Sequence, residues 1–171
     1  MNISIKTFTS SLILFLFSFC ALSKTCEFTR TSVPGEKKYI EQYSIKTDKE
    51  GHAVRVFKTE TIFKNSEKNC DGLKAISSMT WGFSDYTFKN GKVSGYWSTT
   101  YEDESTMYGT WQGTSQSPKD QNKNSINIST QIITGGTGLY SSVTGYGVSN
   151  GEFNPEKGYS KNKLTMYYNK N

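Results

Sequence analysis

The stretch TGGTGLYSSVTGYGVSNG, residues 134–151, is the most informative part of this 171-residue chain. It reads as a glycine-rich turn containing Gly136 and Gly138, followed by a strand in which Gly145 and Gly147 point to one face. Glycine weakens a strand interior, so paired glycines there mark a close approach of two backbones or a sharply coiled strand. The stretch therefore predicts a small, strongly curled β-sheet.

The N-terminus has the features of a secretory signal peptide. Lys6 supplies a positive charge, an apolar run extends from about residue 12 to residue 22, and Ala21 and Ser23 are the small residues of a cleavage site. The run is shorter than the roughly 20 residues that a membrane-spanning helix needs. We therefore expect residues 1–23 to be removed and residues 24–171 to form one domain. The mature protein would be periplasmic or secreted, with a retained N-terminal anchor as the alternative.

The cysteines fit an exported protein. Cys20 leaves with the signal peptide, and Phe19 stands where a lipoprotein signal would have a small residue. Cys26 and Cys70 remain, and two cysteines in an exported chain are expected to form one structural disulfide. A catalytic thiol is disfavoured because His52 is the only histidine in the chain.

The charge pattern argues against nucleic acid as a partner. The formal net charge is +5, and the lysines are spread along the chain with acidic residues among them. Nucleic-acid-binding proteins concentrate their basic residues in a patch or stripe. We expect a solvated, mildly basic surface, with weak attraction to anionic envelope polymers as the alternative.

Short alternating apolar runs, 14% aromatic residues and only three prolines favour strands over amphipathic helices. The clearest hairpin signal is Asn90-Gly91, which predicts a two-residue loop that pairs Lys89 with Lys92 and Tyr86 with Gly95. The side chains expected on its inward face are Tyr86, Phe88, Val93 and Trp97. The strands are expected at residues 26–33, 38–46, 52–63, 73–83, the two arms of the hairpin 86–97, 107–114, 125–133, 146–153 and 163–168.

These strands, with short connections and no clear helix, predict an all-β fold. A single antiparallel, closed β-barrel of eight to nine strands is the expected architecture, because closure removes free sheet edges. A β-sandwich of two sheets is the alternative.

Two segments, MYGTWQGT at residues 107–114 and ITGGTGLYSSVTGYG at residues 133–147, resemble the allene oxide cyclase barrel-like group, which includes the dirigent proteins. The resemblance implies an eight-stranded antiparallel barrel with an apolar lumen, often in homo-oligomers. Plant members guide the cyclisation or radical coupling of apolar substrates. The lumen carboxylate and asparagine of those members have no matching positions here, so the resemblance extends to the fold alone.

Aromatic side chains are the main candidates for a binding site. Two roles are open to them: lining a ligand cavity, with the tyrosine hydroxyl groups as polar handles, or filling the core of a solid barrel. The candidate ligand-binding residues are Trp81, Tyr86, Trp97, Tyr108 and Trp111.

No metal site or cofactor site is expected. His52 beside Gly51 reads as a turn residue, and one histidine without suitably placed helpers does not make a zinc site. The acidic turn at residues 102–104 lacks the spaced ligands of a calcium loop. Residues 135–138 could hold a phosphate only at the start of a helix, and a strand is expected to follow them.

Three functional hypotheses follow. The first is a non-enzymatic exported protein that binds a small apolar or aromatic ligand inside the barrel. The second is a cyclase or isomerase with an inward carboxylate, for which Glu60 is the candidate. The third is a protein-binding module, such as a periplasmic inhibitor, that acts through the polar loop 115–124.

Overall fold

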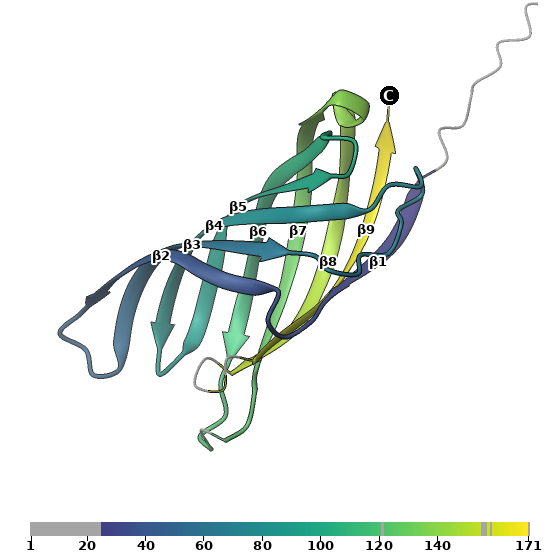
Figure 1. The fold of residues 1–171 in the computed structure, drawn as a ribbon. Helices are drawn as coiled ribbons and strands as arrows, with labels where there is room; N and C mark the ends of the chain where they lie inside the picture. The colour runs from purple at the N-terminus through teal and green to yellow at the C-terminus, as the bar shows by residue number, and fades with distance from the viewer. Residues whose placement is uncertain (1–24, 121, 155–156, 158, 171) are drawn as a thin grey trace, which may run out of the picture.

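The computed structural model describes residues 25–120, 122–154, 157 and 159–170, so the expected signal peptide lies outside the described residues. The described chain consists of nine strands and one short 3₁₀ helix, η1 (Figure 1). The strands are β1 (Cys26–Ser32), β2 (Lys37–Lys46), β3 (His52–Ile62), β4 (Ala75–Thr87), β5 (Asn90–Tyr101), β6 (Thr106–Gln116), β7 (Ser125–Thr137), β8 (Val143–Asn154) and β9 (Tyr159–Lys170). The 3₁₀ helix is η1 (Gly138–Tyr140). The expected all-β class is confirmed, and the expected strand 73–83 and the first arm of the hairpin are one strand, β4.

All nine strands belong to one sheet with the order β1-β9-β8-β7-β6-β5-β4-β3-β2, and every neighbouring pair is antiparallel. The sheet curls into a barrel-like shape (Figure 1). Its two edges, β1 and β2, are not paired with each other in the described part of the chain. Closure of the barrel by backbone hydrogen bonds is therefore not confirmed, and the two-sheet sandwich is excluded by the single continuous sheet.

The two edge strands approach each other where the chain passes from β1 to β2. The buried carboxylate of Glu36 accepts hydrogen bonds from the backbone N–H groups of Val33 (2.9 Å) and Lys64 (2.8 Å). This side chain therefore ties the connection between β1 and β2 to the segment that follows β3.

The hairpin between β4 and β5 differs from the expectation. Its two loop residues are Phe88 and Lys89, both with positive φ (51° and 65°), and Thr87 pairs with Asn90. Phe88 is held there because its ring covers Gly51 in the neighbouring turn, where an added Cβ would lie 2.4 Å from the ring. Asn90 instead uses its side chain to bind the backbone carbonyl of Phe88 at 2.8 Å. The loop moves by two residues, which leaves Tyr86, Val93 and Trp97 on the inward face. Phe88, expected on the inward face, lies in the loop instead and is 61% exposed.

The glycine-rich stretch has the sharp turn and the close backbone approach that its sequence predicts. Gly138 adopts φ +56° and begins η1, so a helical turn rather than a strand follows directly. Gly145 faces Tyr168 across the β8–β9 pair, and an added Cβ there would lie 2.1 Å from the backbone oxygen of Tyr167. Both Gly136 and Gly147 also face inward-packed neighbours.

The hydrophobic core fills one end of the curled sheet, which we call the closed end. The strands run antiparallel, so this end collects the start of β1, the end of β5 and the end of β9. The core residues are Cys26, Phe28, Ala75, Trp97, Tyr101, Met107, Ile133, Tyr140, Val143, Leu164, Met166 and Tyr168. The core therefore leaves the opposite end, which we call the open end, for a cavity.

Candidate functional site: a cavity at the open end of the sheet

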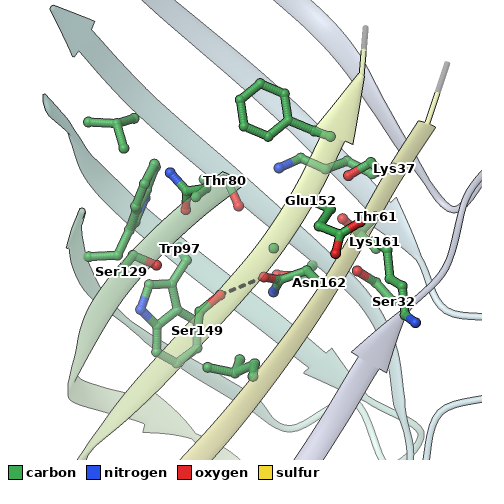
Figure 2. Close-up of a pocket in the computed structure, with 18 of the residues that line it drawn as sticks. Ser32, Lys37, Thr61, Thr80, Trp97, Ser129, Ser149, Glu152, Lys161 and Asn162 are labelled. Carbon is green, nitrogen blue, oxygen red and sulfur yellow. Dashed lines mark hydrogen bonds between the residues drawn. The ribbon is translucent and has the colours of Figure 1, made fainter. Parts of the chain in front are cut away.

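The concave face of the sheet holds a cavity of about 340 Å³ that receives side chains from all nine strands. Figure 2 shows part of its wall, with Ser32 from β1, Lys37 from β2, Thr80 from β4 and Trp97 from β5 around one space. A volume of this size lies at the lower end of the range of about 300–1,000 Å³ that is typical of small-molecule sites. The cavity is large enough for one small organic molecule.

Three of the five aromatic candidates line this cavity: Tyr86, Trp97 and Trp111. Trp97 is buried, and its indole N–H donates a hydrogen bond to the backbone oxygen of Thr110 at 3.2 Å. The indole N–H of Trp111 is buried and has no hydrogen-bond partner. Burial also raises the pKa of the Tyr86 hydroxyl. The cavity wall therefore carries aromatic surface together with a hydrogen-bond donor that is not used within the chain.

The other two candidates, Trp81 and Tyr108, lie on the outer face of the sheet, so the expectation that they line the lumen is wrong. Trp81 is 43% exposed and stands opposite Tyr96 on β5, which is 66% exposed. Tyr108 is 41% exposed on β6. Successive side chains of a strand point to opposite faces, so Trp81 cannot share a face with Tyr86, nor Tyr108 with Trp111.

Both arginines of the chain line the cavity, and sequence reasoning did not single them out. Arg30 lies on the inward face of β1, in phase with Phe28, and is 5% exposed. Arg55 lies on the inward face of β3, in phase with Phe57. The signal was in the sequence: only these two of the twenty basic residues are arginines, and each stands two positions from a phenylalanine in a strand.

Arg30 is buried without an acidic partner. Its guanidinium carbon lies 4.5 Å from the centre of the Phe63 ring, and its Nη2 donates a long hydrogen bond of 3.4 Å to Thr99 Oγ1. Its Nη1 is buried and has no hydrogen-bond partner. Burial lowers the pKa of Arg30, which the nearby hydroxyl of Tyr101 opposes in part. A charged residue of the cavity wall therefore has one nitrogen without a hydrogen-bond partner.

A second positive group lies nearer the β2 edge. The Arg55 guanidinium carbon lies 4.8 Å from the ring centre of Phe57 and 5.3 Å from that of Tyr39, and its Nη1 reaches Gln42 Oε1 at 3.5 Å. Lys37 lines the same cavity, and desolvation there, together with the charge of Arg55, lowers the pKa of Lys37. The acidic side chain on the wall of the described cavity is Glu152, which is exposed.

The rest of the wall is polar and neutral, so the lumen is mixed in character instead of apolar as the family resemblance implied. Ser149 donates a hydrogen bond of 2.6 Å to Asn162 Oδ1 across β8 and β9 (Figure 2). Further hydroxyl and amide groups face the cavity from Ser78, Thr80, Asn127, Ser129 and Gln131. A ligand would therefore meet aromatic surface, positive charge and neutral hydrogen-bonding groups at once.

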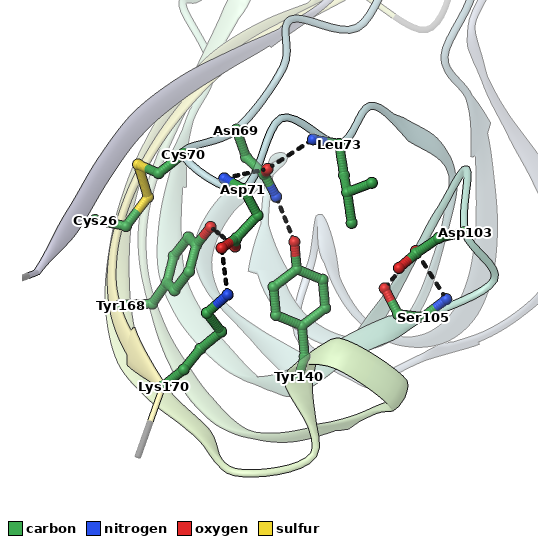
Figure 3. A network of polar contacts seen from close by, with 10 residues as sticks. All are labelled: Cys26, Asn69, Cys70, Asp71, Leu73, Asp103, Ser105, Tyr140, Tyr168 and Lys170. Carbon is green, nitrogen blue, oxygen red and sulfur yellow. Dashed lines mark hydrogen bonds and ion pairs between the residues drawn. A yellow bond between two sulfur atoms is a disulfide. The ribbon is translucent and has the colours of Figure 1, made fainter. Parts of the chain in front are cut away.

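Three buried tyrosines, Tyr101, Tyr140 and Tyr168, form a cluster at the closed end, which we call the tyrosine cluster. Their rings are 4.8 Å apart between Tyr101 and Tyr140 and 6.0 Å apart between Tyr140 and Tyr168. Asn69 donates a hydrogen bond of 2.6 Å to the Tyr140 hydroxyl (Figure 3). Burial raises the pKa of all three phenols. The cluster is therefore held neutral and belongs to the core, not to the cavity.

Asp71 covers this cluster from the loop between β3 and β4 (Figure 3). Its carboxylate accepts a hydrogen bond of 2.6 Å from the Tyr168 hydroxyl and pairs with the ammonium group of Lys170. Partial burial alone would raise the pKa of Asp71, but these two donors outweigh it and lower the pKa below its ordinary value. The loop is thus fixed by an ion pair at the same place as the disulfide.

The expected disulfide between Cys26 and Cys70 is confirmed, with a Cα–Cα distance of 5.8 Å. It joins the first residue of β1 to the loop residue between Asn69 and Asp71. The bond therefore fastens the loop between β3 and β4 to β1 at the edge of the sheet. Asn69 and Asp71, which flank Cys70 in this loop, cover the tyrosine cluster.

The remaining candidate groups lie outside the cavity. His52 bonds Asp85 Oδ1 (2.6 Å) and Thr47 Oγ1 (2.9 Å) at the start of β3. Asp103 in the acidic turn accepts hydrogen bonds from the backbone and hydroxyl of Ser105. The described residues contain no group of three histidine, cysteine or acidic side chains placed to hold a metal ion. None of the described helical segments has the length and apolar character to cross a membrane.

Comparisons with known proteins do not assign the chain to a family. No protein-family model and no curated protein sequence matches the chain. Among solved structures, the chain is similar to the pterocarpan synthase dirigent protein GePTS1, with 11% sequence identity, a TM-score of 0.46 and coverage of 97% of this chain and 100% of that one. This likeness is too slight to carry an argument about function, which must come from the cavity itself.

Proposed function

We propose that this protein binds one small organic molecule with apolar or aromatic character in the cavity, without transforming it. The observation that carries the proposal is the cavity of about 340 Å³ on the concave face, which every strand helps to line. Trp97, Trp111 and Phe57 give it aromatic surface, and aromatic walls with a few placed polar groups are typical of small-molecule sites.

The arrangement of carboxylates favours binding over the cyclase alternative. Glu60, the candidate acid for that chemistry, lies on the outer face of β3 and forms an ion pair with Lys38 at 3.1 Å. It therefore cannot act on a molecule inside the sheet. The cavity's own acidic side chain, Glu152, is exposed on β8, so it is not a buried acid facing the ligand.

Export to the periplasm or the medium is part of this proposal. The Cys26–Cys70 bond supports it, because structural disulfides persist in oxidising compartments. A binding protein outside the cytoplasm would meet its ligand in solution, through the open end of the sheet.

The experiment is a titration of the mature, oxidised protein with the neutral fluorescent amine N-phenyl-1-naphthylamine, whose emission rises in apolar surroundings. We expect saturable binding of one molecule per chain. Thr80→Trp places a large ring in the cavity wall and should abolish binding. Thr114→Trp, which adds the same ring on the outer face of β6, is the matched control and should bind normally. Equal binding by all three proteins would place the dye elsewhere and refute the proposal.

A further inference from the structure

The cavity concentrates positive charge without a matching negative charge. Arg30, Lys37 and Arg55 all line it, Lys161 stands at its rim, and Glu152 is the acidic residue on its described wall. Neither arginine takes part in any ion pair within the described chain. Buried charges are normally paired, so an unpaired buried arginine at a cavity wall indicates that its partner comes from outside the chain.

Arg30 carries this argument furthest. Its side chain is almost wholly buried and its Nη1 lacks a hydrogen-bond partner. Its hydrogen bond to Thr99 is long at 3.4 Å, and the Tyr101 hydroxyl is its other polar neighbour. Stacking on Phe63 fixes the plane of the guanidinium and leaves Nη1 free to donate. A guanidinium with a free nitrogen is a suitable partner for the oxygens of a carboxylate.

Arginine appears here selectively. The chain has twenty basic residues, and its two arginines both face the cavity, whereas its other basic residues are all lysines. Lysine supplies a point charge, while arginine supplies a planar fork that also stacks on aromatic rings. Trp111 adds a second buried donor without a partner on the same cavity wall. The arginine fork and the free indole N–H both suit a ligand that carries a planar hydrogen-bond acceptor on an aromatic or apolar skeleton.

We propose that the ligand of the cavity is an organic acid, whose carboxylate pairs with Arg30 and whose apolar or aromatic body lies against Trp97 and Trp111. This inference rests on the proposed function, because it names the class of molecule that the same cavity binds. Arg55 and Lys37 contribute a field that favours any anion in the cavity, and Arg30 supplies the directional contact.

The experiment compares acids with their neutral amides of the same shape: cinnamate with cinnamamide, 1-naphthoate with 1-naphthamide, and octanoate with octanamide. Binding to the mature, oxidised protein is followed by calorimetry and by the fluorescence of the cavity tryptophans. We expect at least one acid to bind tighter than its amide by about tenfold or more, the factor that one charge-assisted hydrogen bond supplies.

Variants locate the preference. Arg30→Gln should remove the preference for the acid and leave the affinity for the amide unchanged, and Arg30→Lys should restore it only in part. Arg55→Gln serves as a second variant. It removes a charge from the cavity wall but leaves Arg30 in place, so it should weaken acid binding less than Arg30→Gln does. Lys163→Gln removes the same charge from the exposed outer side of β9 and is the matched control, with no expected effect.

The outcomes separate the two proposals. If the naphthylamine dye binds but no acid is preferred over its amide, the ligand class is wrong and the proposed function stands. If the Arg30→Gln and wild-type proteins prefer an acid equally, Arg30 does not hold the carboxylate and the inference is overturned, while the proposed function stands. If neither the dye nor any acid or amide binds, both proposals fail.

Discussion

Replacement of Arg30 by methionine should stabilise the ligand-free protein. The side chain is 5% exposed, so its charge has lost most of its hydration, and the nearby groups of Tyr101 and Glu67 offset that loss only in part. Burial of one ion costs several kcal/mol in real proteins. Methionine has a similar length, no charge and a flexible thioether that fills irregular gaps, so Arg30→Met removes the cost with little loss of packing.

The expected size follows from the contacts that the substitution removes. Stacking of the guanidinium on Phe63 at 4.5 Å is worth about 2 kcal/mol when desolvated. The long hydrogen bond to Thr99 adds at most about 1 kcal/mol. Set against several kcal/mol of desolvation, these leave a net stabilisation of about 1–3 kcal/mol, which corresponds to a rise in Tm of about 3–9 °C for a domain of this size.

The assay is urea denaturation and thermal unfolding of the mature, oxidised, ligand-free protein, followed by tryptophan fluorescence. Arg55→Met is the matched control. In the wild-type protein Arg55 is less buried than Arg30 and contacts Gln42, so the charge of Arg55 costs less and its replacement should change stability little. A ligand at 100 times its Kd stabilises the folded state by about 2.7 kcal/mol. We expect an acid that the wild-type protein binds to give this stabilisation there and not in Arg30→Met.

A fall in stability would refute this reasoning. If Arg30→Met lost 1 kcal/mol or more, the contacts of Arg30 with Phe63 and Thr99 would outweigh its desolvation. Arg30 would then be a structural residue that holds β1 to the rest of the wall, and its free Nη1 would carry no functional meaning.

Three further predictions concern the closed end. Removing the disulfide by Cys26→Ser with Cys70→Ser should lower the free energy of unfolding by about 4 kcal/mol, as expected for a sequence separation of 44 residues, in urea denaturation. Gly145→Ala should cost about 1–3 kcal/mol, because its Cβ would lie 2.1 Å from a backbone oxygen, whereas Gly147→Ala, at 3.1 Å or more from its neighbours, should be near neutral in the same assay. Stability should depend on pH at both extremes. The raised pKa of each phenol in the tyrosine cluster contributes stability below pH about 10 that is lost as pH rises further, by up to about 1.4 kcal/mol per pH unit for each phenol, and a spectrophotometric tyrosinate titration should coincide with unfolding. The lowered pKa of Asp71 contributes stability above pH about 4 that is lost as pH falls below it, and Asp71→Asn should remove that acid limb from the pH–stability curve.

Strand periodicity predicts the positions of the strands well, and it also determines which aromatic side chains of the candidate site can share a face. Alternating patterns located every strand, although they divided β4 in two, and the spacing of Gly145 and Gly147 predicted that both share one face of β8. Trp81 and Tyr86, however, are five residues apart in one strand, so they must point to opposite faces. The same rule applied to every aromatic residue would have separated the cavity wall from the outer face.

Other features could not be read from local sequence. Asn90-Gly91 favours a hairpin loop on its own, but the contact of the Phe88 ring with Gly51 joins two turns far apart in the chain and moves the loop by two residues. The ion pair of Asp71 with Lys170 likewise joins distant parts of the chain. Local propensity is a weak guide wherever such long-range contacts decide the outcome.

The two ends of the sheet divide stability from binding. Core packing, the disulfide and the Asp71–Lys170 pair all lie at the closed end, where they stabilise the fold. Arg30 and the unpartnered indole of Trp111 line the cavity, where they cost stability without a ligand. Proteins retain such unfavourable groups where function requires them and compensate for them elsewhere. Substitutions at the closed end should therefore change Tm and leave ligand affinity intact, whereas Arg30→Met should raise Tm and lose the acid ligand.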